Sequence, residues 1–285
     1  MRGPASLAYL LARTSDTLAD TAAAPPAARM DCLTSFAQAM TGSAPPPLWP
    51  VLLAKAVTDL RERRLLEETD ALFSWLGSLP AAQAQLVREV VAIIISGQRL
   101  DLERFATADQ TQPVTLADDA MLEDYAWRVA GCVGAFWTKL GFLTLGERFS
   151  TAPAALLLER GIAFGKGLQL VNILRDLPAD LAAGRCYLPV PDPHDTASLL
   201  EAHRQWGRRA WEWVGAGSAY ADTLHSRRLR AATALPAMLA RETLERLRNA
   251  SWLDLQTRVK VPRTRVYLAL ARALAKGGMR AGQGE

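Results

Sequence analysis

Apolar residues recur at helical spacing along almost the whole chain, and the alternation typical of strands is almost absent. Ala, Leu and Arg, which favour helices, are abundant. Proline and glycine clusters interrupt the pattern at a few points, such as Pro45 to Pro47 and Pro189 to Pro193. None of these breaks is long enough to be a convincing linker. The pattern therefore predicts an all-α fold of one large domain or two, with a flexible tail over residues 277–285.

The length of the chain is sufficient for a substantial core, because half of its 285 residues are hydrophobic. We expect long helices between the breaks. They cover residues 5–21, 28–40, 48–78, 81–104, 117–141, 152–183, 196–223, 228–249 and 262–276.

The charge and the cysteines exclude several classes of protein. The net charge of +4 comes from dispersed arginines, and no nucleic-acid-binding motif accompanies it. Cys32, Cys132 and Cys186 are widely spaced and form no CxxC pair, so neither a disulfide framework nor a zinc site is indicated. We expect a protein of the reducing cytoplasm that binds no nucleic acid.

The apolar runs are short. The longest, Val90 to Ile95, is far below the roughly 20 residues that a spanning helix needs. Arg13 and Asp16 interrupt the first apolar stretch, so no secretory signal is visible. We therefore expect a soluble protein, or one in peripheral contact with the inner face of the membrane.

Two aspartate pairs carry the clearest chemical signal. Asp16 and Asp20 are four residues apart, and so are Asp176 and Asp180. This spacing places both carboxylates of a pair on one face of a helix, one turn apart. Two acidic faces brought opposite each other would form a cage for hard divalent cations.

Magnesium is the cation that this pattern fits best. It is typically held by one or two carboxylates together with phosphate oxygens and water. Asn172 precedes Asp176 by four residues, so its amide oxygen is a further candidate ligand, and Gln169 lies one turn earlier. Arg13 and Arg175, next to the two pairs, would bind a diphosphate through bidentate hydrogen bonds.

A simpler alternative is that the four aspartates are solvated carboxylates paired with neighbouring arginines. The segment from Phe164 to Leu174 argues against it, because the segment is mostly apolar and its polar positions form a narrow stripe. That stripe indicates side chains that line a cavity.

Pro178 lies between the two aspartates of the second pair. It removes an amide N–H and clashes with the carbonyl of Leu174, four residues back. We expect a kink or local loosening at this turn. The alternative is that the helix ends near residue 178 and Asp180 lies in the following turn.

Four stretches of the chain resemble the squalene and phytoene synthase family of head-to-head prenyl synthases. Residues 9–20 resemble its first aspartate-rich motif, and residues 125–134 its central tyrosine motif. Residues 167–180 and 184–189 resemble its second aspartate-rich motif and the tail of that motif. Fainter similarity occurs at residues 97–101 and 259–262. The Asp-Thr at Asp16 favours the squalene synthase branch.

The resemblance implies a single-domain isoprenoid-synthase helical bundle over residues 1–276, whose two acidic motifs face each other across a central cavity. It implies the condensation of two farnesyl diphosphates through presqualene diphosphate, with reduction to squalene by NADPH. In this reading Mg²⁺ assists the release of diphosphate. The implied metal ligands are Asp16, Asp20, Asn172, Asp176 and Asp180.

The resemblance also implies roles for other residues. Tyr125 would lie near the reacting carbons. The substrate-binding residues would be Arg13, Gln169, Asn172, Arg175, Arg185 and Tyr187. Lys260 would either contact the nucleotide phosphate or be a solvated residue at the start of the C-terminal helix, and no Rossmann fingerprint is present. The aromatic rings of Phe136, Trp137 and Phe164 would either stabilise carbocations or pack in the core.

Family members usually carry an N-terminal helical segment before the first motif, whereas Asp16 lies almost at the start of this chain. We expect a monomer or weak homodimer. The alternatives are a sister enzyme that makes phytoene, dehydrosqualene or presqualene diphosphate, and a non-catalytic helical scaffold of the same fold. A head-to-tail prenyltransferase is disfavoured, because its acidic motifs are spaced and flanked differently.

Overall fold

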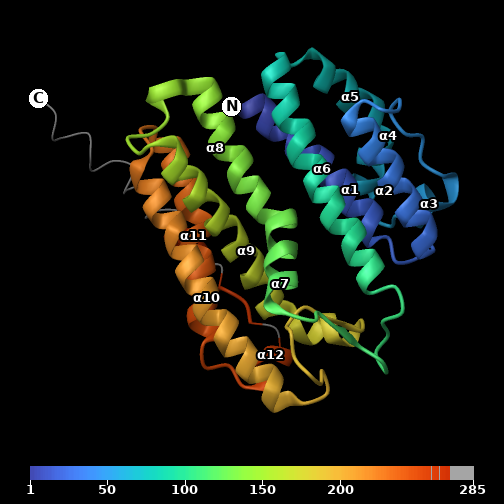
Figure 1. Cartoon of the computed structure of the whole chain (residues 1–285), viewed down its shortest axis with the longest axis vertical. Coiled ribbons are helices and arrows are strands. Elements are labelled where there is room, and N and C mark those ends of the chain that lie inside the picture. The colour runs from blue at the N-terminus through green and yellow to red at the C-terminus, as the bar shows by residue number, and fades with distance from the viewer. Residues whose placement is uncertain (258, 263, 270–285) are drawn as a thin grey trace, which may run out of the picture. The chain divides into compact units, whose positions relative to one another are not determined.

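The computed structural model describes residues 1–257, 259–262 and 264–269, and it is almost entirely helical (Figure 1). The prediction of an all-α fold is confirmed. Contacts between Cα atoms group the chain into two compact units, Met1–Thr107 and Ala108–Glu285. The expected single domain over residues 1–276 stays a prediction. The expected tail over 277–285 lies outside the described residues, as does part of the expected helix over 262–276, of which residues 264–269 are helical.

The first unit contains six helices among its residues. Their bounds are α1 Arg2–Asp20, α2 Pro26–Thr41, α3 Val51–Ala56, α4 Leu60–Glu67, α5 Thr69–Ser78 and α6 Ala81–Arg104. Helix α1 packs against α6 and α2. The apolar stripe of α1, with Leu7, Leu11 and Leu18 fully buried, supplies one side of this core. Phe36 of α2 and Ile95 of α6 are also fully buried.

The prediction of one long helix over residues 48–78 is wrong, because three short helices occupy this stretch. Val57 adopts an extended conformation after α3. The Asp59 side chain then accepts hydrogen bonds from the amides of Arg61 and Glu62, which starts a new helix at Leu60. This N-cap competes with helix continuation and stabilises the break.

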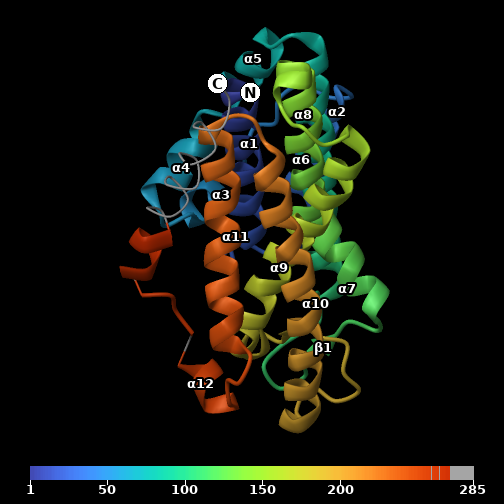
Figure 2. The same ribbon diagram turned by 90° about the vertical axis from the view of Figure 1, so that its left-hand side faces the viewer.

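The second unit contains most of the long helices. Their bounds are α7 Asp119–Ala126, α8 Cys132–Leu145, α9 Ala154–Ala182, α10 Thr196–Thr223, α11 Arg227–Leu247 and α12 Trp252–Gln256. A π-helical turn, η1 Trp127–Gly131, joins α7 to α8, and a 3₁₀ turn, η2 Gly146–Arg148, follows α8. Helices α10 and α11 run side by side and both pack against α9 (Figure 2).

Helices α8 and α9 approach each other closely because glycines lie at their crossing. A Cβ atom on Gly134 would come within 1.8 Å of the carbonyl oxygen of Gly161, and one on Gly165 within 2.3 Å of the carbonyl oxygen of Ala130. Real side chains cannot approach backbone atoms this closely. The glycines therefore set the distance between the two helices that line the apolar pocket described below.

A short parallel ladder links two parts of the second unit. Strand β1 Val114–Thr115 pairs with β2 Arg185–Cys186, with Val114 opposite Arg185. Gly184 precedes β2 with φ of 80°, and a Cβ atom there would lie 2.5 Å from the amide nitrogen of Asp109. Glycine fits both the left-handed conformation and the close contact. The ladder ties the segment that follows α9 to the segment that precedes α7.

One helical stretch, Asp119–Arg148, is long and apolar enough to cross a membrane by length and composition, and part of it is buried. Core helices share these properties, and its α8 portion packs against α9. The observation is weak evidence for a membrane span. The expected soluble or peripheral character stays a prediction.

We expect the three thiols to resist alkylation in the native protein. Cys32, Cys132 and Cys186 are buried and free. Burial raises the pKa of Cys132 to about 12 and that of Cys186 to about 11. Because the thiolate is the reactive form, labelling with iodoacetamide at pH 8 should be at least about 100-fold slower in native than in urea-unfolded protein. Rapid labelling of the native chain, measured by mass spectrometry, would contradict the packing around these residues.

Candidate active site

The first aspartate pair lies near the C-terminal end of α1. Asp16 is partly buried and Asp20 is exposed as the last residue of the helix. The amide Nε2 of Gln98, from α6, donates a hydrogen bond to Oδ1 of Asp16 at 2.5 Å. We call Arg13, Asp16 and Asp20 the α1 acidic face.

The electrostatics of this face suit a cation. Burial raises the pKa of Asp16, and repulsion by Asp20 adds to the shift, while Gln98 and Arg13 oppose it. A carboxylate that is partly desolvated and faces another carboxylate is destabilised in its charged form. A bound divalent cation would remove this destabilisation, which fits the predicted magnesium site.

The residues next to Asp16 in sequence are small, polar and buried. Thr14, Ser15 and Thr17 are buried, and their hydroxyls donate to main-chain carbonyls of the preceding turn. This back-bonding satisfies their polar atoms inside the unit. Asp16, which lies between them in sequence, is only partly buried and accepts its hydrogen bond from Gln98 of α6.

Arg13 is held by carboxylates in this structure. It forms an ion pair with Glu62 of α4, and its Nη1 lies 4.0 Å from Oδ2 of Asp16. Its predicted diphosphate-binding role stays a prediction. It requires the guanidinium to exchange at least one of these carboxylates for a phosphate oxygen.

The second aspartate pair lies in the C-terminal half of α9. Asn172 is exposed, and Asp176 and Asp180 are partly buried. We call these three residues the α9 acidic face. Arg175 donates to both carboxylate oxygens of Asp176, at 3.0 and 2.5 Å, and Arg185 donates to Asp180 at 3.1 Å. Each aspartate of this pair therefore has an arginine partner.

Helix α9 continues through Pro178 to Ala182, so the alternative in which it ends near residue 178 is wrong. Nε2 of His203, from α10, lies 3.2 Å from the carbonyl oxygen of Leu174, the group whose helical partner Pro178 removes. Asp176 and Asp180 consequently lie in one unbroken helix, as the four-residue spacing predicted.

Two tyrosines lie next to the α9 acidic face. The ring of Tyr125, from α7, stacks on that of Tyr187 with centroids 4.9 Å apart and planes 18° from parallel. Tyr187 follows Arg185 by two residues, and Arg185 pairs with Asp180. The structure thus brings the central tyrosine motif and the second aspartate motif together within one unit. The π-helical turn directly after α7 is a feature often found at functional sites.

Two pockets of the second unit differ in character. One, of about 310 Å³, is apolar and lies among η1, α8, α9, α10 and α11. Gly134, Trp137, Gly161, Phe164 and Leu168 are among its lining residues. Its volume is at the lower end of the range of small-molecule sites, about 300–1,000 Å³. An apolar ligand chain fits this lining.

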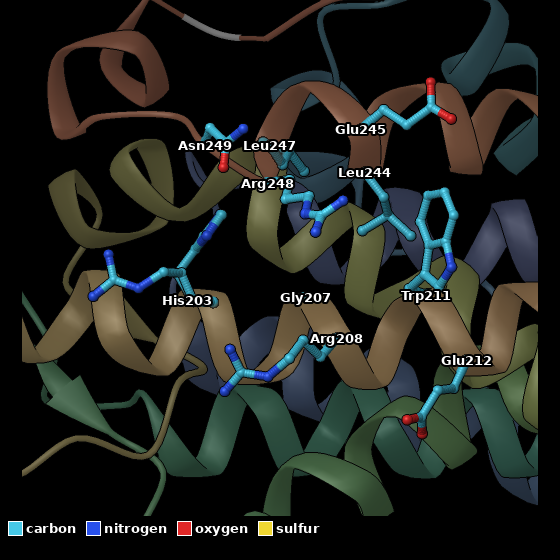
Figure 3. A pocket seen from close by; sticks show the side chains of 11 residues that line it. His203, Gly207, Arg208, Trp211, Glu212, Leu244, Glu245, Leu247, Arg248 and Asn249 are labelled. Atoms are coloured by element: carbon cyan, nitrogen blue, oxygen red, sulfur yellow. The ribbon is translucent and has the colours of Figure 1, made fainter.

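The other pocket, of about 560 Å³, lies between α10 and the C-terminal end of α11 (Figure 3). His203, Arg208 and Trp211 of α10 line it, together with Leu244 of α11 and Arg248 directly after that helix. Its mixture of arginines and glutamates contrasts with the apolar pocket. None of the predicted site residues lines it.

The remaining predicted residues lie in varied surroundings. Gln169 is partly buried on α9, and Lys260 is exposed in a coil segment after α12. Trp137 and Phe164 line the apolar pocket, whereas Phe136 is buried and is not among its lining residues. Within either unit, the described residues contain no group of three His, Cys, Asp or Glu side chains that could hold a metal ion by themselves. How the two acidic faces are placed relative to each other stays a prediction.

Sequence reasoning missed three residues that contact the predicted site. Glu62 pairs with Arg13, Gln98 donates to Asp16, and His203 donates to the turn that contains Pro178. Gln98 lies within residues 97–101, which show faint similarity to the family. That similarity was the available signal, but it assigned no role to Gln98. For His203 the signal was Pro178 itself, because a proline inside a helix leaves a carbonyl that needs another donor.

The helical fold and its two acidic faces define a protein of the isoprenoid-synthase class. The chain belongs to the squalene/phytoene synthase family, whose family model matches residues 1–265. The resemblance seen in the sequence is thereby confirmed.

Curated relatives match parts of the chain. A 15-cis-phytoene synthase of Synechocystis sp. is 38% identical over 104 residues, covering 35% of this chain and 28% of the relative. A presqualene diphosphate synthase of Zymomonas mobilis is 33% identical over 110 residues, covering 39% and 32%. The matched segments thus span less than a third of these relatives' length.

The similarity to solved structures extends over more of the chain. A solved structure of TcSQS in complex with the ligand E5700 matches this chain with a TM-score of 0.74 at 22% identity. The match covers 95% of this chain and 79% of that one. At this level of identity the likeness shows a shared fold.

Proposed function

We propose that this protein condenses two prenyl diphosphates head to head, with farnesyl diphosphate as the substrate. The observation that carries the proposal is the pair of acidic faces, each on one side of a single helix. The tyrosine stack beside the second face and the apolar pocket in the same unit support it. Family membership narrows the chemistry to head-to-head coupling.

Magnesium fits the donors that the two faces offer. The proposed ligands are Asp16, Asp20, Asn172, Asp176 and Asp180, all of which present hard oxygen atoms. The raised pKa of Asp16 is the electrostatic sign of a site that gains from a bound cation. When bound, the metal supplies Lewis-acid neutralisation of the leaving diphosphate.

The arginines next to the aspartates act as diphosphate donors in this proposal. Arg175 and Arg185 already hold carboxylates in hydrogen-bonding geometry, so their guanidinium groups are ordered before substrate arrives. A phosphate group offers the same bidentate acceptor geometry as a carboxylate. Binding would then exchange one anion for another with little loss of side-chain freedom.

The apolar pocket would hold prenyl carbon and exclude water from it. Trp137 and Phe164 offer ring faces that can stabilise an allylic cation without reacting with it. Tyr125, fixed by its stack on Tyr187, would lie near the reacting carbons and assist proton removal or steady the leaving group. Gly134, Gly161 and Gly165 of the α8–α9 crossing also line this pocket.

The proposal also specifies the product of the reaction. The expected route runs through presqualene diphosphate, and reduction to squalene by NADPH would follow it. The names of the relatives favour a reaction that ends at presqualene diphosphate or phytoene. A phytoene-forming enzyme would take geranylgeranyl diphosphate as its substrate. The cytoplasmic location and peripheral membrane contact also stay predictions.

The deciding experiment incubates the full chain with Mg²⁺ and farnesyl diphosphate, with and without NADPH. Released diphosphate is measured, and the lipid extract is analysed by mass spectrometry. We expect presqualene diphosphate without NADPH, and squalene on its addition if the reductive step belongs to this chain. A parallel reaction with geranylgeranyl diphosphate tests the phytoene alternative.

The same experiment tests the non-catalytic scaffold of this fold. Retention of all four aspartates argues against a scaffold. If neither prenyl diphosphate releases diphosphate in the presence of Mg²⁺, while the chain remains helical and folded, the proposed function is wrong.

A further inference from the structure

Pro178 interrupts the main-chain hydrogen bonding of α9 between the two aspartates of the α9 acidic face. It lies inside α9, between Asp176 and Asp180, and has no amide hydrogen to donate to the carbonyl of Leu174. Leu174 is fully buried, so water cannot readily take the place of that hydrogen. A buried carbonyl without a donor is costly, and the turn that aligns the two aspartates would be weakened.

His203 supplies a donor at this point. Its Nε2 lies 3.2 Å from the carbonyl oxygen of Leu174, within the range of a hydrogen bond. A carbonyl only accepts, so the ring nitrogen that faces it carries the hydrogen. His203 is 3% exposed, and burial lowers the pKa of its ring, which keeps it neutral at pH 7.

The surroundings fix this donor in place. Helix α10, which carries His203, packs along α9. Figure 3 shows the His203 ring rising from α10 at one end of the pocket between α10 and α11. The neighbouring Trp206, also buried, anchors the same part of α10. A side chain from a second helix thus replaces the missing main-chain donor.

We propose that His203 is a positioning residue for the α9 acidic face, acting through its hydrogen bond to the Leu174 carbonyl. The bond substitutes for the amide hydrogen that Pro178 lacks and keeps Asp176 and Asp180 on one continuous helix. The catalytic consequence rests on the proposed prenyl-diphosphate chemistry. The structural consequence is independent of it.

The test is a rescue by the main chain. His203→Leu removes the donor and leaves a side chain that can remain buried. Pro178→Ala returns an amide hydrogen to the Leu174 carbonyl. If the hydrogen bond is what matters, His203→Leu should be harmful with Pro178 present and nearly neutral in the Pro178→Ala background. His203→Gln, which keeps an N–H donor on its side chain, and His194→Leu, at an exposed histidine, are the controls.

The first readout is hydrogen exchange of amides in residues 176–182 of the full chain, measured by mass spectrometry. In His203→Leu we expect exchange about tenfold faster than in the wild type, the factor that the loss of one hydrogen bond corresponds to. The double variant should return to within about threefold. His203→Gln and His194→Leu should stay near the wild type.

The second readout is diphosphate release from farnesyl diphosphate, titrated with Mg²⁺. His203→Leu should raise the Mg²⁺ concentration for half-maximal rate by about tenfold, and the double variant should restore it. A residue that only packs would lower the melting temperature without changing this concentration, and Pro178→Ala would not rescue it.

The outcomes separate this inference from the proposed function. If exchange responds as expected but the wild type releases no diphosphate, the positioning of the acidic pair holds and the proposed function fails. If exchange in residues 176–182 is unchanged in His203→Leu, or Pro178→Ala fails to restore it, the inference is overturned. Should His203→Leu not fold, failure of the double variant to fold as well would also overturn it.

Discussion

Asp16→Asn and Asp176→Asn are each expected to lower diphosphate release at least about 100-fold, the loss typical when a charge-stabilising group is removed from an active site. The change replaces a carboxylate by an amide of nearly the same shape, so ligand charge is lost while packing is kept. Helical circular dichroism should be unchanged. Asp31→Asn, at an exposed aspartate of α2 outside both acidic faces, is the matched control and should retain full activity.

We also expect a specific change in the melting temperature of Asp16→Asn. Because burial and Asp20 raise the pKa of Asp16, its charged form destabilises the folded state at neutral pH. The neutral amide removes this effect, so the melting temperature of Asp16→Asn should equal or exceed that of the wild type. Loss of activity together with loss of fold would instead indicate a structural role. Turnover retained in either variant would contradict the assignment of the metal ligands.

Gly134→Ala is expected to lower the free energy of unfolding by about 3 kcal/mol or more, because the added methyl group cannot be accommodated. Its carbon would lie 1.8 Å from the carbonyl oxygen of Gly161 and 2.4 Å from the carbonyl carbon. Both are backbone atoms, so α8 and α9 would have to separate. The apolar pocket between them would change shape as well. Urea unfolding followed by circular dichroism measures the effect.

Gly207→Ala provides the comparison for this variant. Gly207 lies in the interior of α10, and a Cβ atom there meets nothing within 4 Å. Alanine should therefore stabilise the helix by about 0.5–1 kcal/mol. Equal stabilities of the two variants would show that the α8–α9 crossing tolerates a side chain and that the glycines do not set its distance.

Some of the fold followed from local sequence because helices depend on nearby residues. The helix over residues 81–104 was predicted with the bounds that α6 has. The break within residues 48–78 was missed, although its cause is also local: the Asp59 side chain caps a new helix. That prediction relied on the helical spacing of apolar residues over the whole stretch and did not consider Asp59 as a capping residue.

Part of the candidate site also followed from local sequence, and part depended on residues distant in the chain. The four-residue spacings alone predicted that Asp176 and Asp180 share a helix face, and α9 confirms it. The partners of these residues could not be predicted, because they come from elsewhere in the chain. Gln98 is 82 residues from Asp16, and His203 is 29 residues from Leu174. No local pattern determines which distant side chain will face a given carboxylate or carbonyl.

The sequence by itself determined that the chain is helical and that each aspartate pair lies on one helix face, since the 3.6-residue period acts within a single segment. The tertiary structure decided the chemistry of those faces. It partly buried Asp16 beside Gln98, stacked Tyr125 on Tyr187, and placed His203 against the carbonyl that Pro178 left without a donor. Burial and partner choice arise when separate helices pack together, and so they depend on contacts that no single segment contains.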